Sequence, residues 1–337
     1  MPEISLLHPL PLPDGHVLTA SARGDRLLLA LDDAPLVSLR SEADHLQCVE
    51  VYGGDAKRAL WSACYWLFAH QPDTQRLYWT GLELDDDVVG AALHSGLLQL
   101  DDQQQLLCER QAFWQLAKPW QRGLLAADYP QQMIMTTGKR HPRRPPKPLG
   151  EVYRRFDARL QAWVSLRTLD IDTDLTRFSR WQNSARVMEF WQEGGSLEQH
   201  REYLQKLAVD PHTVTLIGCI DDEPFAYFEA YWAKEDRIAP FYAAGDHDRG
   251  IHMLVGEEHH RGPHKVAAWL AALVHWLYLD DPRTCLVVAE PRADNGKMIG
   301  HMQRLGFYRE KEFDFPHKRA ALMAISRETF FDRGPLC

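Results

Sequence analysis

The residues from Gly250 to Phe307 contain the pattern that points most directly to chemistry. An apolar, strand-like run is followed by the short basic turn Arg261-Gly262-Pro263-His264-Lys265, and a long helical pattern begins within that turn. The backbone N–H groups of a turn that leads into a helix can converge on one phosphate. The sequence therefore predicts a site for a phosphorylated ligand, with Arg261 and Lys265 adding charge-assisted bonds. A capped turn with a surface arginine is the simpler alternative.

Three ionisable side chains flank this turn in the sequence. His252 lies on the strand before it, and Glu290 and Asp294 follow the next apolar strand. A histidine and a carboxylate that face each other in a site with little water are suited to taking a proton from a nucleophile. In the structural alternative, His252 is a hydrogen-bonded core histidine and Asp294 is the N-cap of the helix that follows.

The composition of the chain narrows the class of protein. Its 337 residues are enough for two domains, and 45% apolar and 25% charged residues are typical of a globular protein. A formal net charge of −9 argues against a general nucleic-acid binder. No apolar run is long enough to span a bilayer, and Met1–Ser5 shows no start of a secretory signal. We therefore expect a cytoplasmic protein with neither nucleic acid nor membrane as a partner.

The spacing of cysteine and histidine gives no sign of a metal site. The six cysteines have no CxxC spacing and are interpreted as reduced thiols. Among the sixteen histidines the densest group is His259, His260 and His264, but no carboxylate or cysteine stands at ligand spacing from it. Adjacent residues on a turn rarely converge on one ion. We predict that the protein holds no metal.

The elements that position these residues form two α/β patterns. Within residues 1–117 we predict strands at 27–40, 48–52, 77–82 and 106–116, and helices at 55–69 and 86–94. Within residues 151–337 we predict strands at 163–169, 214–220, 225–232, 251–256, 285–289, 307–313 and 319–325, and helices at 172–183, 264–279, 294–305 and from 196, where Ser196 and Gln199 form a capping box. The fold class is α/β (α+β), with an antiparallel front and a parallel βαβ crossover in the C-terminal sheet.

Residues 118–150 separate the two patterns. They are rich in proline, glycine, lysine and arginine, and the run Lys139–Pro148 is unsuited to a helix or a central strand. We interpret this stretch as a linker or extended arm that is solvated rather than ligand-binding.

Five motifs occur in order in the C-terminal domain. They are His252–Glu257, Arg261–His264, Leu279–Thr284, Glu290–Asn295 and Lys311–Arg319, and Asn295 stands eleven residues before Gly306-Phe307. From about residue 144 to 331 the chain resembles the GNAT-fold acyltransferases of hydroxamate siderophore biosynthesis, which act on N6-hydroxylysine and related N-hydroxydiamines. The GNAT phosphate-loop pattern, Gln/Arg-x-x-Gly-x-Gly/Ala, is only partly kept, since His259–His264 retains just its first glycine, Gly262.

The resemblance implies a reaction. The enzyme would take an acetyl or succinyl group from acetyl-CoA or succinyl-CoA and transfer it directly to the N-hydroxylated amine of N6-hydroxylysine or of an N-hydroxydiamine of the cadaverine or putrescine type. The product would be a hydroxamate for iron acquisition. The resemblance also implies functional hand-off with an N-hydroxylase and a siderophore synthetase. The oligomeric state is not determined.

The resemblance also implies site residues. His252 and Asp294 would form the general-base pair, and which of them takes the proton stays open. The CoA-binding residues would be Val255, Gly256, Arg261, Gly262, His264, Lys265 and Asn295. Many GNAT enzymes place a tyrosine seven residues after the helix asparagine to protonate the thiolate, but here that position is Met302, so the general acid is unassigned.

Substrate selectivity is less clearly indicated. The acceptor slot could be lined by Trp191, Tyr227, Glu229, Tyr231 and Trp232, although aromatic residues at strand spacing are more often core. Asp246–Arg249 could hold a distal ammonium or carboxylate, and Lys318 and Arg319 could receive a succinyl carboxylate or be exposed charges at the end of a strand.

The first domain repeats the order strand, helix, strand, helix, glycine and strand of the second. It could be a reduced GNAT-like half without a CoA site, because Asp55 in its turn would repel phosphate; an unrelated α/β cap fits the pattern equally well. For the whole chain, the alternative functions are a GNAT N-acetyltransferase for an aminoglycoside or protein lysine, and a non-catalytic CoA-binding module.

Overall fold

The computed structural model describes residues 8–42, 45–80 and 86–336, and the chain divides into two compact units. The first unit contains the described residues up to Pro119, together with Phe156–Gln161 and Leu336. The second contains Trp120–Arg155 and Ala162–Pro335. Each unit is built on its own eight-stranded sheet.

The sheet of the second unit carries the residues singled out above. Its strands, in spatial order, are β11 (Glu151–Asp157), β12 (Ala162–Thr168), β13 (Thr213–Ile220), β14 (Glu223–Trp232), β15 (Arg249–Val255), β16 (Leu286–Ala289), β18 (Lys318–Ser326) and β17 (Tyr308–Phe315). β15 and β16 pair in parallel. The neighbouring strands from β12 to β15 pair antiparallel, and β18 pairs antiparallel with both β16 and β17. The mixed sheet confirms the expected antiparallel front and parallel crossover.

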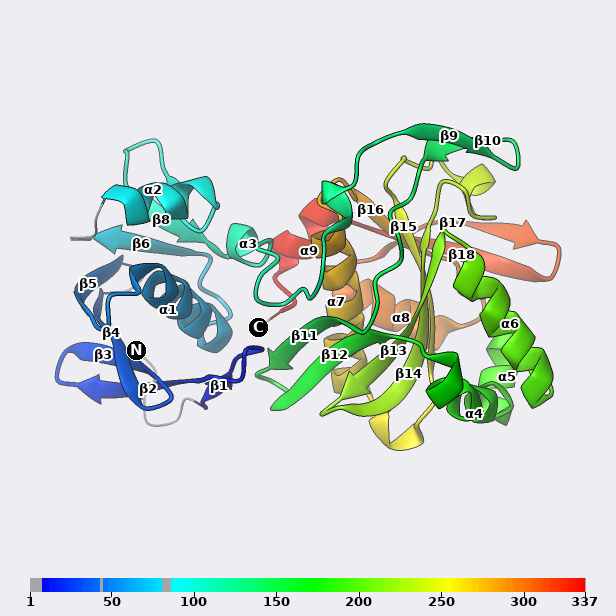
Figure 1. Cartoon of the computed structure of the whole chain (residues 1–337), viewed down its shortest axis with the longest axis horizontal. Coiled ribbons are helices and arrows are strands. Elements are labelled where there is room, and N and C mark those ends of the chain that lie inside the picture. The colour runs from blue at the N-terminus through cyan, green and yellow to red at the C-terminus, as the bar shows by residue number, and fades with distance from the viewer. Residues whose placement is uncertain (1–7, 43–44, 81–85, 337) are drawn as a thin grey trace. The chain divides into compact units, whose positions relative to one another are not determined.

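Helices connect these strands, and the chain can be followed in Figure 1. Between β12 and β13 lie α4 (Ile171–Gln182), α5 (Ala185–Trp191) and α6 (Leu197–Val209). The crossover from β15 to β16 is η4 (Glu258–His260) and α7 (Pro263–Asp280), and α8 (Gly296–Leu305) follows β16. Ser196 and Gln199 form the predicted capping box at the start of α6.

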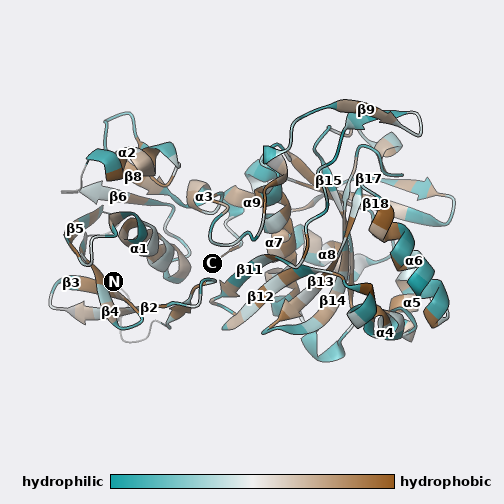
Figure 2. Ribbon diagram, viewed as in Figure 1, coloured by the Kyte–Doolittle hydropathy of each residue, from teal (hydrophilic) through white to brown (hydrophobic). Residues whose placement is uncertain are grey.

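The side chains of β14 alternate between the two faces of the sheet, and helices cover both faces. Tyr227 belongs to a buried apolar cluster with residues of α4, α5 and α6, whereas the ring of Phe228 stacks on Trp269 of α7. Successive side chains of a strand point to opposite faces, so Glu229 and Tyr231 lie on the same face as Tyr227. Figure 2 shows the matching contrast between the hydrophobic α7 and the largely hydrophilic α6.

The first unit repeats the strand order of the second. Its sheet runs β1 (Leu10–Pro11), β2 (Val17–Arg23), β3 (Arg26–Leu31), β4 (Ala34–Glu42), β5 (His45–Val51), β6 (Arg76–Thr80), β8 (Leu106–Glu109) and β7 (Gln99–Leu100). Its parallel pair is again between the fifth and sixth strands, β5 and β6, with α1 (Ala56–His70) as the crossover and α2 (Asp86–His94) next. The two sheets share one strand order, and the described residues between β2 and β3 hold no counterpart of α4–α6; that the first unit is a reduced GNAT-like half stays a prediction.

Two predicted segments differ from the structure. The strand expected at 106–116 ends at Glu109 and is followed by α3 (Arg110–Phe113), because the buried Arg110 donates to the carbonyls of Phe68, Gln71 and Thr74. The stretch 118–150 contains η2 (Ala126–Asp128) and a hairpin of β9 (Met133–Thr136) and β10 (Lys139–Pro142). It is not simply solvated, since Arg144 is buried and pairs with Glu235 at 2.5 Å.

Further elements were not predicted. They are β1, β2, β7, β11, α5, η4, the short η3 (Ala239–Phe241) and the last helix α9 (Arg327–Arg333). Among the described helices, none combines the length and apolar character needed to cross a membrane.

Candidate active site

The strands β15 and β16 separate where the candidate catalytic residues lie. They pair only at Arg249↔Val287 and Gly250↔Val288, although β15 continues to Val255. His252 lies just beyond the last paired residue of β15, and Glu290 directly follows β16. The two side chains meet across this opening, with 2.6 Å between His252 Nε2 and Glu290 Oε1.

His252 is held between two buried carboxylates. Glu229 lies opposite it in the β14–β15 register, and its Oε2 is 2.7 Å from His252 Nδ1. The side chains of Glu229 and Glu290 are 6% and 0% exposed, against 19% for His252. The remaining carboxylate oxygens accept hydrogen bonds from tyrosine hydroxyls: Tyr203 and Tyr227 donate to Glu229 Oε1, and Tyr231 donates to Glu290 Oε2.

This arrangement sets the protonation state of His252. An ionised carboxylate only accepts hydrogen bonds, so both ring nitrogens must donate, which makes the ring an imidazolium. Burial by itself lowers the pKa of His252, but the charges and hydrogen bonds of Glu290 and Glu229 outweigh burial and raise it to about 10. Burial raises the pKa of Glu290, yet His252, Lys318 and Tyr231 more than reverse this, and the pKa lies below its usual value.

Asp294, the predicted partner of His252, makes a different contact. Its side chain is 63% exposed, and its Oδ2 lies 2.5 Å from Nη2 of Arg292. The Arg292 hydrogen bond is the largest influence on the Asp294 carboxyl and lowers its pKa. Nor is Asp294 the N-cap of α8, since Asn295 Oδ1 accepts from the Met298 N–H at 3.2 Å. The residue that the structure brings to His252 at this end of β16 is Glu290.

The other predicted acceptor-site residues divide into two groups. The rings of Trp191 and Tyr231 lie beside His252, with centroid distances of 6.3 and 4.8 Å. Trp232 does not line this site, because the guanidinium groups of Arg144 and Arg249 lie 4.3 and 4.0 Å from its ring centroid.

The segment Asp246–Arg249 makes structural contacts of its own. Arg249 forms an ion pair with Asp280 at 2.8 Å, and Asp248 Oδ2 accepts from the N–H of Gly245. These contacts replace the expected role of the segment in holding the distal end of a substrate.

The predicted phosphate turn begins an uncapped helix. Gly262, with φ +133°, is the N-cap residue of α7 and provides no side-chain hydrogen bond. Pro263 has no N–H, and the N–H groups of His264 and Lys265 stand in the first turn, where helix geometry offers no intrahelical acceptor. Arg261 is exposed beside them. These residues fit a phosphate group, which favours such an N terminus.

Four predicted CoA residues have structural partners. The N–H of Gly256 donates to Phe225 O, and a side chain at Gly256 would meet the ring of Trp181 at 2.1 Å. Arg186 donates to the carbonyl of Val255, and Lys265 Nζ donates to His259 O at 2.8 Å. Asn295 caps α8, as described above. The contacts of Val255, Gly256 and Lys265 therefore hold the backbone around the turn, and that of Asn295 holds the start of α8.

Comparison with known proteins agrees with this geometry. A family model described as an acetyltransferase (GNAT) domain matches residues 170–315. The N(6)-hydroxylysine O-acetyltransferase of Escherichia coli is 43% identical over 231 residues, which are 67% of this chain and 71% of that protein. The chain belongs to the GNAT acyltransferase family.

Other relatives are similar to a comparable or smaller share of the chain. The putative lysine N-acyltransferase of Schizosaccharomyces pombe is 47% identical over 66% of this chain and 66% of its own length. The N(5)-hydroxyornithine:cis-anhydromevalonyl coenzyme A-N(5)-transacylase of Beauveria bassiana is 49% identical over 58% of this chain, but only 44% of that protein is matched. An uncharacterized protein from Bacillus halodurans, known from a crystal structure, has a TM-score of 0.53 at 31% identity and covers 56% of this chain and 96% of its own.

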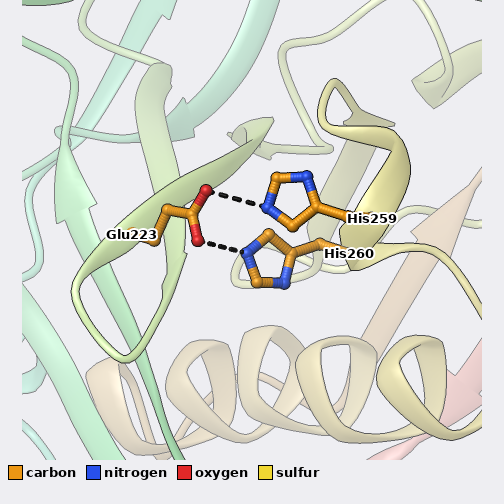
Figure 3. A group of neighbouring side chains, drawn as sticks. All are labelled: Glu223, His259 and His260. Atoms are coloured by element: carbon orange, nitrogen blue, oxygen red, sulfur yellow. Dashed lines mark hydrogen bonds and ion pairs between the residues drawn. The ribbon is translucent and has the colours of Figure 1, made fainter.

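A second cluster lies at the turn of this GNAT domain (Figure 3). Glu223, at the start of β14, places Oε1 2.8 Å from His259 Nε2 and Oε2 3.0 Å from His260 Nε2. The three ligand atoms lie within 4.8 Å of one another, so the sequence-based statement that no carboxylate accompanies these histidines is wrong. The carboxylate comes from a hairpin 36 residues earlier in the chain.

The hydrogen-bond pattern favours a hydrogen-bonded clamp over a metal site. Lys265 Nζ can only donate, and it lies 3.4 Å from His260 Nδ1, so Nδ1 accepts this hydrogen bond. The other ring nitrogen, Nε2, therefore carries the hydrogen and donates to the Glu223 carboxylate. A metal would need that nitrogen unprotonated. In this arrangement the cluster fastens the turn before α7 to the β13–β14 hairpin.

Sequence reasoning missed part of the site. Glu229 was noted only as a possible lining residue, and Glu290 was noted but not chosen. A signal was present, since Tyr227, Glu229 and Tyr231 alternate along one strand and place polar groups on one face of an otherwise apolar run. Tyr203 gave no such signal, because its contact with Glu229 depends on how α6 packs on the sheet.

Proposed function

We propose that this protein transfers an acetyl or succinyl group from acyl-CoA to the N-hydroxylated amine of N6-hydroxylysine or of an N-hydroxydiamine. The product is a hydroxamate, the iron-chelating group of a siderophore. The observation that carries the proposal is the imidazolium of His252 between Glu229 and Glu290, at the opening between β15 and β16. Two relatives are named as acyltransferases of N(6)-hydroxylysine and N(5)-hydroxyornithine, which supports the choice of acceptor.

We place the acyl-CoA phosphates at the start of α7. Arg261 and the first-turn N–H groups of α7 supply the donors, and Gly262 leaves the helix end free of a competing side chain. The equivalent helix of the first unit, α1, is closed by its own Asp55, whose carboxylate accepts from the Arg58 N–H at 3.0 Å. We therefore propose a single CoA site, in the second unit.

The protonation of His252 suggests its role. An N-hydroxylated amine is neutral near pH 7, so it needs positioning against the thioester more than activation. During the transfer the amine nitrogen loses a proton and the thiol sulfur gains one. We assign to the His252 imidazolium the role of general acid, which protonates the thiol sulfur. The general base, which takes the proton from the amine nitrogen, is a carboxylate: Glu290 is our first choice, and the exposed Asp294 is the alternative. Met302 is fully buried and cannot take the acid role.

Direct transfer without an acyl-enzyme is part of the proposal. Cys219 is the cysteine in the apolar cluster beneath α4–α6, and burial raises the pKa of its thiol. A protonated thiol is a weak nucleophile. We accordingly propose a complex in which both substrates are bound before the acyl group moves. We also propose that the protein acts in the cytoplasm, between an N-hydroxylase and a synthetase.

Product analysis tests the function. The protein is incubated with acetyl-CoA or succinyl-CoA and with N6-hydroxylysine, N-hydroxycadaverine or N-hydroxyputrescine, and the products are identified by mass spectrometry. Lysine and cadaverine, which lack the hydroxyl group, serve as matched controls. We expect hydroxamate only from the hydroxylated amines. Equal acylation of the controls, or of an aminoglycoside, would identify a different GNAT activity, and CoA binding without any turnover would identify a binding module.

A further inference from the structure

Two cations from different parts of the chain converge beside Glu290. Arg237, in the segment after β14, places Nη2 3.5 Å from Glu290 Oε1. Lys318, the first residue of β18, donates from Nζ to the backbone carbonyl of Glu290 at 2.7 Å. Both cations also lie by one aromatic ring, with Arg237 Cζ 5.2 Å and Lys318 Nζ 5.7 Å from the centroid of Phe315. The convergence is therefore built by packing.

The charges in this part of the site do not cancel. The two carboxylates Glu229 and Glu290 face three cations, the imidazolium of His252, Arg237 and Lys318, which leaves one positive charge in excess. Arg292 pairs with Asp294, while Asp236, whose charge also attracts Arg237 and Lys318, lies 3.4 Å from His212. Burial lowers the pKa of Lys318, and the charges of Arg237 and Arg292 lower it further despite Glu290. An additional anion would relieve this repulsion.

The excess charge is accessible from outside. The Arg237 side chain is 49% exposed, whereas the Glu290 side chain beneath it is fully buried. Arg319, which sequence analysis grouped with Lys318, is not part of this cluster: it pairs with Glu312 at 2.9 Å on the exposed part of the β17–β18 hairpin. The side chains of Lys318 and Arg319 point to opposite faces of the sheet because successive side chains alternate along a strand.

We propose that Arg237 and Lys318 form a subsite for one carboxylate of the substrate pair, next to the reacting groups. This proposal rests on the proposed function, in which the carboxylate belongs either to the acceptor, as the α-carboxylate of N6-hydroxylysine, or to the acyl group, as the far end of succinyl. The planar guanidinium of Arg237 can bind a carboxylate through two parallel hydrogen bonds, and the Lys318 ammonium adds a second positive charge.

Specificity ratios test the subsite. For wild type, Arg237→Gln and Lys318→Met, kcat/KM is measured for acetyl-CoA with N6-hydroxylysine and for succinyl-CoA with N-hydroxycadaverine. The reference is acetyl-CoA with N-pentylhydroxylamine, which has no second charged group. Effects on His252 act on every pair and cancel in the ratio to the reference. Arg319→Gln is the matched control, and CoA binding, which uses the start of α7, shows that each variant is folded.

We expect both variants to lower one ratio at least tenfold while Arg319→Gln leaves it unchanged. A fall in the hydroxylysine ratio assigns the carboxylate to the acceptor, and a fall in the succinyl ratio assigns it to the acyl group. Turnover with both ratios unchanged in Arg237→Gln and Lys318→Met would overturn the subsite and leave the proposed function standing. A wild-type protein that acylates no hydroxylamine would overturn the proposed function and the subsite with it.

Discussion

His252 Nε2 and Glu290 Oε1 lie 2.6 Å apart, although the two residues are 38 positions apart in the chain. The contact exists because β15 and β16 stop pairing at Gly250↔Val288, so the side chains that follow can turn toward each other. Glu229 completes the arrangement from the neighbouring strand. A single imidazolium thus joins two buried carboxylates, and its properties can be tested from either side.

The carboxylate that accepts the proton beside His252 can be identified by substitution. We expect Glu290→Gln to lower kcat by about 10²-fold, because an amide neither accepts the proton nor holds the imidazolium. Steady-state kinetics with N6-hydroxylysine measure the change, and CoA affinity should stay within about twofold of wild type because the phosphate turn is untouched.

Asp294→Asn provides the comparison. The exposed Asp294 is paired with Arg292, so we expect its loss to lower kcat by less than about tenfold. A larger effect for Asp294→Asn than for Glu290→Gln would assign the role of proton acceptor to Asp294.

The pH dependence follows from the raised pKa of His252. The folded-state pKa of about 10 lies above the usual value of 6.5, so the imidazolium stabilises the fold fully below pH 6.5 and loses this contribution as the pH rises toward 10. We expect the basic limb of kcat/KM to lie near pH 10. In Glu229→Gln, which removes one carboxylate, this limb should move to lower pH; a limb that stays in place would show that His252 does not control it.

The ring of Tyr231 on β14 leaves no room for a side chain at Gly250. A Cβ there would lie 2.0 Å from the ring of Tyr231, whose hydroxyl donates to Glu290. We expect Gly250→Ala to destabilise the fold by about 1–3 kcal/mol through overpacking and to reduce kcat by displacing this hydroxyl. Thermal unfolding and kinetics measure both effects. Gly296→Ala, at a position with no atom within 4 Å of the added Cβ, is the matched control.

Arg261 is expected to act on donor binding alone. We expect Arg261→Gln to weaken CoA binding about tenfold, in the range for losing one charged hydrogen bond, with kcat little changed. Calorimetric titration with CoA measures the affinity. Asp55→Asn, at the start of the equivalent helix in the first unit, should leave it unaltered; an increase in the number of CoA molecules bound would show that the first unit can also hold the cofactor.

The cluster of Glu223, His259 and His260 should act without metal. Because His260 Nε2–H donates a hydrogen bond to Glu223, we expect treatment with EDTA to leave acyl transfer and thermal stability unchanged. Glu223→Gln should instead loosen the turn and raise KM for acyl-CoA by severalfold. If EDTA lowers activity and Zn²⁺ restores it, the cluster is a metal site and the clamp interpretation is wrong.

Local patterns in the sequence predicted most of the second unit. The strands β13 to β16, the helix α7 and the capping box of α6 were recognised because alternation, helical periodicity and end signals depend on residues close together in the chain. The order of elements also suggested a repeat, and the strand order of the first sheet matches that of the second. Arg110 and Arg144 were harder, since their burial depends on carbonyl and carboxylate partners from distant segments.

The sequence by itself determined the family and indicated the turn at Gly262 and His252 as candidates, because each depends on residue types at short spacing. The tertiary structure decided the partners of His252. Strand register places Glu229 opposite it, the end of the β15–β16 pairing brings Glu290 to its other nitrogen, and Arg237 reaches Glu290 from a separate segment. Sequence spacing carries no information on these contacts, since the register and the point where two strands part are set by the packing of the whole sheet.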